Sequence, residues 1–273
     1  MLPRLSPDGR RVAVAITEQE THIWLYDFAR EALTRLTFEG EANSVPVWTP
    51  DGKRIAFNSS KEGSLNIFWQ LSDGSGGLER LTTSQYLHTP ESWSPDGQLL
   101  AFFEVNPASQ RDIWVLRMSD RKVQPFLRTQ FDEAVPQFSP DGRWLAYISN
   151  ETGRHEIYVQ SYPGPGGKWQ ISNDGGTEPV WNPNGRELFY RNADKLMAVD
   201  IAMQPGFSAG TPRMLFQGQY VVAPFPASNY DVSRDGQRFL MLKPVEQVAG
   251  PTQINVVLNW FEELKRRVPV GAK

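Results

Sequence analysis

The feature that most constrains the fold is a four-residue turn that recurs along the chain. Its copies read SPDG, TPDG, SPDG, SPDG, NPNG and SRDG, at residues 6–9, 49–52, 94–97, 139–142, 182–185 and 233–236. Successive copies begin 43, 45, 45, 43 and 51 residues apart. A nearly fixed period of roughly 40 to 50 residues is typical of the four-stranded blade of a propeller.

The residue types indicate that this segment is a turn and not a set of acids. Proline presets φ at the second position, Ser or Asn can accept from the backbone, and Gly can take a positive φ. Asn184 replaces the aspartate in the fifth copy, and Arg234 replaces the proline in the sixth. We therefore predict that the repeated aspartates form turns and are neither metal ligands nor catalytic acids.

Four segments rich in β-branched and aromatic residues accompany each turn, as expected of strands. In the second repeat they are residues 45–48, 54–59, 66–71 and 78–82. Nine Trp, fifteen Phe and eight Tyr supply material for a large core. We predict an all-β fold, a six-bladed β-propeller of four-stranded antiparallel blades over residues 1–258.

The sixth repeat contains fewer strands than the others. Residues 229–232, 238–242 and 254–260 give three strands, and the N-terminal segment "LPRL" begins the first blade. A fourth strand would have to come from residues before Met1. We therefore expect the last blade to be incomplete and the chain to be a piece of a longer protein.

Residues 259–273 are predicted to form a short C-terminal helical tail, with Trp260, Phe261 and Leu264 on one face. An uncovered edge strand invites pairing with another chain. The helix could cover the edge of the sixth blade. Alternatively, the edge or the helix could join two copies of the chain as a homodimer.

The repeat resembles that of a known family. The pattern W-[ST]-P-D-G-x-x-[IL]-A-[FY], seen in "WSPDGQLLAF" at 93–102, is followed by a [DN]-I-[WY] strand such as "DIW" at 112–114. This combination is similar to the TolB-type, WD-like propeller repeat, and the similarity covers essentially the whole chain. The segment "QINVVLNWFEELKRRVP" at 253–269 resembles the end of propellers fused to bacterial serine/threonine kinases, although the sequence contains no kinase motif.

Composition limits the partners and the compartment. The net charge of −3 gives no basic surface for nucleic acid or anionic membrane. The absence of cysteine excludes disulfides and thiolate ligands. No apolar run approaches the length of a membrane span, and the first residues form no signal peptide. We expect a soluble chain, and the compartment stays open, although the family is often periplasmic.

The repeat register places seven polar side chains at one end of the central channel, where chains enter the first strands and where second strands connect to third strands. These residues are His22, His88, His155, Asn43, Glu133, Glu178 and Asn229. Such groups could hold Ca²⁺ through oxygen or Zn²⁺ through nitrogen, and a bound metal could activate water. The alternative is that a channel mouth is polar because it is wet, in which case no cofactor is needed.

The resemblance implies a binding module for peptides, partner proteins or small ligands, acting as a sensor or scaffold through its central funnel. Contact candidates at the funnel are Glu62, Glu104, Glu151 and Tyr86. The alternative is a metal-dependent hydrolase of phosphotriesters, lactones or aryl esters, in which His88 and Glu133 serve as ligands or base. A third hypothesis is the accessory propeller of a prolyl peptidase, whose catalytic domain this chain lacks. Whether the chain is an enzyme stays open.

Overall fold

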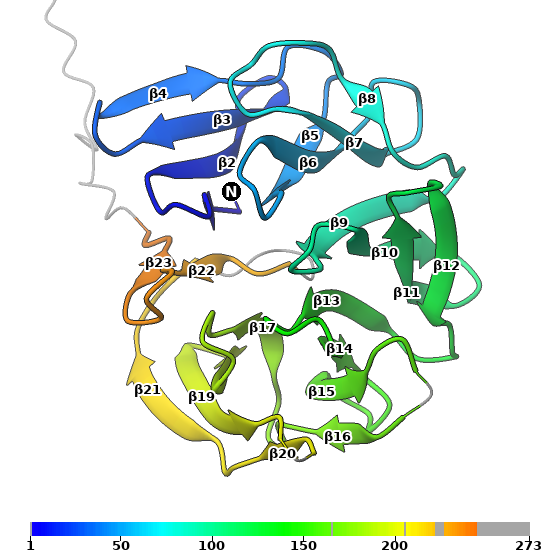
Figure 1. Cartoon of the computed structure of the whole chain (residues 1–273), viewed down its shortest axis with the longest axis vertical. Coiled ribbons are helices and arrows are strands. Elements are labelled where there is room, and N and C mark those ends of the chain that lie inside the picture. The colour runs from blue at the N-terminus through cyan, green and yellow to red at the C-terminus, as the bar shows by residue number, and fades with distance from the viewer. Residues whose placement is uncertain (1, 165, 205, 222–226, 245–273) are drawn as a thin grey trace, which may run out of the picture. The chain divides into compact units, whose positions relative to one another are not determined.

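Every regular element of the described chain is a β-strand. A computed structural model describes residues 2–164, 166–204, 206–221 and 227–244. Within these residues consecutive strands pair antiparallel into separate sheets, which follow one another around a common centre (Figure 1). The predicted C-terminal helix at 259–273 and the predicted strand at 254–260 lie outside the described residues.

Four sheets have the predicted four strands, in chain order from the innermost strand outward. Blade one consists of β1 (Arg4–Leu5), β2 (Arg11–Thr17), β3 (Thr21–Asp27) and β4 (Ala32–Arg35). Blade two consists of β5 (Asn43–Trp48), β6 (Arg54–Ser59), β7 (Asn66–Leu71) and β8 (Glu79–Arg80). Blade three consists of β9 (Leu87–Trp93), β10 (Leu99–Asn106), β11 (Gln110–Arg117) and β12 (Lys122–Leu127). Blade four consists of β13 (Glu133–Phe138), β14 (Trp144–Ser149), β15 (Glu156–Ser161) and β16 (Lys168–Gln170).

The fifth sheet is larger than predicted and the sixth is smaller. Blade five consists of β17 (Thr177–Trp181), β18 (Glu187–Asn192), β19 (Lys195–Ala202), β21 (Arg213–Gln217) and the short β20 (Ser208–Ala209), which also pairs with β19. The described part of the sixth repeat forms only the two-stranded sheet β22 (Tyr230–Val232) and β23 (Phe239–Met241). The prediction of six blades is therefore wrong for the described chain, which has five. The reason is that the sixth repeat supplies one hairpin there, while β1 pairs with β2 in blade one.

All six predicted turns are present, and their side chains act as predicted. In the third copy the Ser94 hydroxyl donates to Asp96 Oδ1 at 2.6 Å and accepts from the Leu99 N–H at 2.9 Å. The same Asp96 oxygen accepts from the Gln98 N–H at 3.0 Å, and Gly97 has φ 69°. The Ser94 hydroxyl holds the pKa of Asp96 below its usual range. The carboxylate is thus occupied by its own turn.

Consecutive turns contact one another through glycine and proline. A Cβ on Gly52 would lie 3.6 Å from Cδ of Pro7, and a Cβ on Gly97 would lie 3.6 Å from Cδ of Pro50. The contact recurs at Gly142, where the distance to Cδ of Pro95 would be 3.3 Å. Glycine is therefore favoured here by its positive φ, and the neighbouring proline ring lies in van der Waals contact with it, most tightly at Gly142.

Neighbouring innermost strands are joined by hydrogen bonds from side chains. The Trp48 indole N–H donates to the Arg4 carbonyl at 3.0 Å, and the Trp181 indole N–H donates to the Gln137 carbonyl at 3.0 Å. Blade four has Phe138 at this position, which has no N–H. There the Ser92 hydroxyl accepts from the Phe138 N–H at 2.9 Å and donates to the Pro136 carbonyl at 3.0 Å.

The seam between the sixth repeat and blade one uses different contacts. Arg234 stands where the other five turns have proline, and a Cβ on Gly9 would meet no described atom within 4 Å. Instead Asp231 Oδ2 accepts from the Leu5 N–H at 2.7 Å, and Arg4 donates to the Ser228 carbonyl at 2.7 Å. These charged contacts replace the glycine–proline contact at the seam.

We predict that Asp231→Ala lowers the free energy of unfolding by about 1 to 3 kcal/mol, because it leaves the part-buried Leu5 N–H without its acceptor. The matched control is Asp235→Ala in the exposed turn of the same hairpin, with an expected loss of about 1 kcal/mol or less. Urea unfolding followed by tryptophan fluorescence measures both. Equal losses for the two variants would show that Asp231 does not hold the seam.

Candidate functional site

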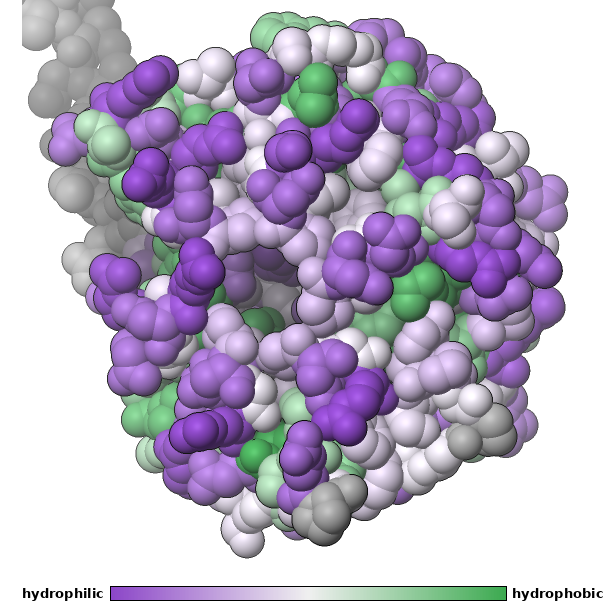
Figure 2. All heavy atoms as spheres, viewed as in Figure 1, coloured by the Kyte–Doolittle hydropathy of each residue, from purple (hydrophilic) through white to green (hydrophobic). Residues whose placement is uncertain are grey.

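A central channel opens among the turns. A cavity of about 920 Å³, which we call the channel mouth, is lined by residues of the turns, including Pro7, Pro50, Pro95, Pro140 and Pro183. A second cavity of about 220 Å³, the inner chamber, shares several lining residues with the mouth and lies among the innermost strands. Figure 2 shows a hollow near the centre of the ring of sheets, with a largely hydrophilic rim.

Each repeat places one comparable residue on the inner chamber. These residues directly precede the Trp, Phe, Leu or Val that ends the innermost strand, and they are Arg4, Val47, Ser92, Gln137, Val180 and Asp231. Four of the six are polar or charged. The chamber is therefore a place where different blades can present donors and acceptors to one ligand.

Glu91 is the most unusual residue of the chamber. It stands two residues before Trp93, where four other repeats have Pro3, Pro46, Pro136 or Pro179. Its side chain is 2% exposed, and neither carboxyl oxygen has a hydrogen-bond partner. Burial raises the pKa of Glu91 from 4.5 to about 8. Buried polar groups are nearly always bonded in folded proteins, so this carboxyl needs an explanation.

The backbone of blade three explains why an acid can occupy this position. In blades two, four and five a bulge gives Val45, Val135 or Glu178 a positive φ, and proline follows. In blade three the corresponding residue is Pro90, whose ring excludes positive φ. The register shift there lies around Glu91, between the pairs Phe102–Pro90 and Ala101–Ser92.

Other charged groups act on Glu91 across the channel. Arg4 counteracts the rise in the pKa of Glu91, whereas Glu178 adds to it. Arg4 donates to the carbonyls of Pro3 and Ser228 and leaves one terminal nitrogen without a partner. Glu178 accepts from the Asn229 N–H at 2.8 Å, and burial raises its pKa and that of Asp231. The Arg4 guanidinium therefore counteracts the rise in the pKa of all three carboxyl groups, and Arg191 also counteracts that of Glu178.

The residues predicted from sequence lie at the other end of the innermost strands. The turns follow those strands, whereas Asn43, His88 and Glu133 lie at or near their starts. None of the seven predicted side chains lines the channel mouth or the inner chamber. Glu178 alone among them acts on the chamber, through its charge on Glu91.

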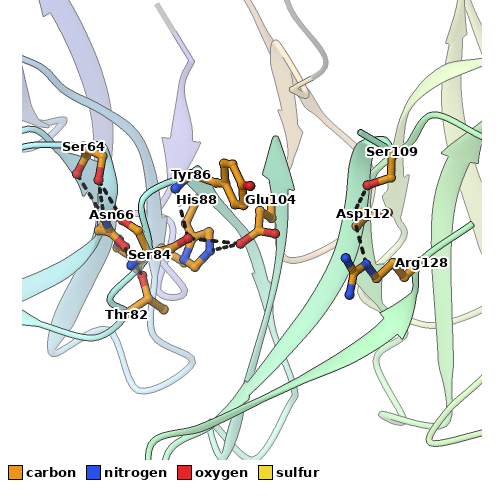
Figure 3. Close-up of polar contacts among 11 residues, drawn as sticks. Ser64, Asn66, Thr82, Ser84, Tyr86, His88, Glu104, Ser109, Asp112 and Arg128 are labelled. Atoms are coloured by element: carbon orange, nitrogen blue, oxygen red, sulfur yellow. Dashed lines mark hydrogen bonds and ion pairs between the residues drawn. The ribbon is translucent and has the colours of Figure 1, made fainter. Parts of the chain in front are cut away.

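His22 occupies a structural position of the repeat. The equivalent residues, each directly before an isoleucine of the third strand, are His22, Asn66, Asp112 and Glu156. The Thr37 hydroxyl accepts from the Ile23 N–H at 2.9 Å and lies 3.3 Å from His22 Nδ1. Asn66 and Thr82 form the same arrangement in blade two (Figure 3). This histidine therefore satisfies local backbone and side-chain groups.

His88 and His155 each lie beside a carboxylate, as His22 does beside Glu20 at 2.8 Å. His88 Nε2 lies 2.8 Å from Glu104 Oε2, which also accepts from Ser84, and the two side chains point toward each other in Figure 3. Burial lowers the pKa of His88, and its Nδ1 has no partner. His155 Nε2 lies 3.0 Å from Asp132 Oδ2. The histidines thus belong to separate blades and separate pairs.

The remaining predicted ligands are also held locally. Asn43 Nδ2 lies 3.3 Å from His22 Nδ1 and donates to the Glu39 carbonyl at 3.0 Å. Glu133 accepts from Thr129 at 2.8 Å, and burial raises its pKa. Over the described ranges, no three His, Asp or Glu side chains have a geometry suited to a metal ion. The residues therefore do not fit the metal centre of the hydrolase hypothesis.

The four contact candidates have local partners as well. Glu62 pairs with Arg80, Glu151 pairs with Lys168, and Glu104 pairs with His88. Tyr86 donates its backbone N–H to Ser84. None of the four lines the mouth or the chamber.

Comparison with known proteins identifies the repeat. The family model described as the TolB beta propeller domain (PD40) matches residues 1–109 and 86–231. This chain belongs to the TolB β-propeller family. A curated relative, the uncharacterized protein Atu1656 of Agrobacterium fabrum, is 38% identical over 71 residues. That match covers 26% of this chain and only 24% of the relative.

Solved structures support the same fold. A protein assigned as TolB from Agrobacterium tumefaciens has a TM-score of 0.71 at 20% identity, with coverage of 89% of this chain and 90% of that chain. TolB from Acinetobacter baumannii has a TM-score of 0.65 at 20% identity, covering 88% and 65%. An oligogalacturonate lyase in complex with manganese has a TM-score of 0.61 at 13% identity, covering 86% and 68%. At such identities the likeness concerns the fold alone.

Within the part of the chain that the structure describes, no helix is long and apolar enough to cross a bilayer.

We predict that Glu91 makes the stability of this TolB-family propeller depend on pH. Because its pKa is raised from 4.5 to about 8, the folded chain binds the proton more tightly than the unfolded chain. The free energy of unfolding should therefore fall as pH rises between these values. Relative to Glu91→Gln, the wild type should lose about 2 to 4 kcal/mol from pH ~5 to pH ~8.5.

Urea unfolding at a series of pH values measures this difference, with the exposed Glu18→Gln as the matched control. The control should follow the wild type at every pH. A constant difference between wild type and Glu91→Gln over the whole range would mean that Glu91 titrates alike in the folded and unfolded chains.

Proposed function

We propose that this TolB-family propeller is a binding module that receives an extended peptide segment of a partner protein at the channel mouth. The observation that carries the proposal is the mouth of about 920 Å³, which leads to the inner chamber. A mouth of this size has room for several side chains of an extended peptide. Its rim, held by contacts between consecutive turns, is preformed, which lowers the cost of binding.

The chemistry of the mouth favours binding over catalysis. Its lining residues include no histidine. The Ser6 and Ser139 hydroxyls there donate to Asp8 and Asp141 of their own turns, at 2.6 Å in each case. A serine nucleophile needs a general base oriented to remove its proton, and these turn aspartates also accept backbone N–H groups. The hydroxyls are therefore structural.

The mouth offers both aromatic and charged contacts to a peptide. Trp93 and Trp181 line it from blades three and five, together with Arg11 and Arg234. Aromatic and arginine side chains contribute strongly to protein–protein recognition. We propose a role as sensor or scaffold on this basis, and the resemblance of residues 253–269 to kinase-fused propellers agrees with it.

The test is selection of peptide binders from a displayed random library, followed by measurement of their affinity for two tryptophan variants. Gln137→Trp adds bulk inside the channel, because Gln137 lines both the mouth and the chamber. Gln98→Trp adds the same side chain on the exposed surface of a turn. We expect Gln137→Trp to weaken binding at least about tenfold and Gln98→Trp to leave it unchanged.

Selected peptides that bind both variants as tightly as the wild type would place the binding surface elsewhere. A library that yields no binder to the folded wild-type chain would contradict peptide recognition itself.

A further inference from the structure

We propose that the inner chamber is a subsite for a primary ammonium group, with Glu91 as its counter-ion. The group would be carried by a lysine side chain or by the amino terminus of a peptide. This inference deepens the proposed function, because the ammonium group would arrive on a peptide that enters through the channel mouth.

The first argument is the unsatisfied state of Glu91. Both of its oxygens are shielded from solvent and bond nothing, whereas its backbone carbonyl lies 3.4 Å from Gln137 Nε2. Turning the carboxyl group into the chamber therefore breaks no hydrogen bond. A bound ammonium group would supply the charge-assisted bond that this carboxyl lacks.

The second argument is the balance of charge around the chamber. Glu91, Glu178 and Asp231 come from blades three and five and from the sixth repeat, whereas two cations act on them, Arg4 on all three and Arg191 on Glu178. One nitrogen of Arg4 is already committed to two carbonyl oxygens. The remaining excess of carboxyl groups favours a cation over an anion.

The third argument selects the kind of cation. Among the described residues, no three His, Asp or Glu side chains form a group that could hold a metal ion. An ammonium group has three donors that can diverge toward acceptors on different blades, and it sits on a slender flexible stem. A chamber of about 220 Å³ admits such a group and part of its stem.

The protonation state of Glu91 gives a second way to detect the bound ammonium group. Since burial holds the pKa of this acid near 8, binding of a cation at neutral pH should ionise it and release a proton. The groups facing it are Arg4 on β1, Glu178 on β17, and Tyr230 and Asp231 on β22. Affinity for an ammonium probe should therefore rise with pH through this range, until the probe itself loses its proton.

The experiment uses three small probes and NMR titration of the full chain. Nα-acetyl-lysine methylamide carries only a side-chain ammonium group, alanine methylamide carries only an α-ammonium group, and Nα-acetyl-norleucine methylamide is neutral. We expect at least one ammonium probe to bind about tenfold more tightly than the neutral probe. Which one binds identifies the source of the ammonium group.

Three variants separate the charge of Glu91 from its structural effect. Glu91→Gln should weaken ammonium binding about tenfold, Glu91→Asp should retain most of it, and the exposed Glu18→Gln should leave it unchanged. Circular dichroism and the urea midpoint establish that each variant is folded. Calorimetry in two buffers of different ionisation enthalpy should show proton release on binding to the wild type at pH ~7 but not to Glu91→Gln.

The inference is overturned if no ammonium probe binds up to its solubility limit, if the neutral probe binds equally well, or if Glu91→Gln binds like the wild type. These outcomes are distinct from failure of the proposed function. Library-selected peptides that are excluded by Gln137→Trp but indifferent to Glu91→Gln would leave peptide binding intact and remove only the ammonium subsite.

Discussion

The channel depends on the contact between the glycine of one turn and the proline of the turn before it. Five turns are first made rigid by a Ser or Thr hydroxyl and an Asp carboxylate, and the fifth copy by Asn182 and Asn184, whose side chains accept backbone N–H groups within the turn. A neighbouring proline ring then packs beside the glycine, most tightly at Gly142, where an added Cβ would lie 3.3 Å from Cδ of Pro95. Repetition of this glycine–proline contact positions neighbouring blades at the mouth. Deeper in the channel, hydrogen bonds from an indole N–H to a backbone carbonyl, such as Trp48 to Arg4, join the innermost strands of neighbouring blades.

Where the repeat changes, the chain acquires features that the regular blades lack. Arg234 in place of proline removes the turn contact at the seam, and Asp231 and Arg4 join the sixth repeat to blade one through hydrogen bonds. Glu91 in place of proline puts an unpaired acid inside the channel. Arg4 and Asp231 of the seam line the inner chamber together with Glu91, so the seam and the candidate site are parts of one polar centre.

The sequence predicted most of the fold because the repeat determines local structure. The strands expected at 54–59 and 66–71 coincide with β6 and β7, and every predicted turn formed. The number of blades was wrong, because periodicity counts repeats and does not show how many strands the last one contributes. The helix expected at 259–273 lies outside the described residues and stays a prediction.

The site was harder to predict. The repeat register shows which side chains lie at the same end of the channel, but it does not show at which end the mouth and the chamber lie. His22 and His88 sit in hydrogen-bonded positions whose partners, Thr37 and Glu104, are distant in sequence. Glu91 could nevertheless be recognised as unusual in the sequence, because four other repeats have proline at the same position. That its carboxyl group is buried without a hydrogen-bond partner, by contrast, is shown only by the structure.

The most direct measurement on the central claim is a carbon-detected NMR titration of the Glu91 carboxyl group, assigned by comparison with Glu91→Gln. An acid that is buried and unpaired in the channel should titrate with a midpoint near pH 8. A midpoint near the ordinary value of 4.5 would show that the carboxyl is solvated or paired, and would contradict the account of the channel given above.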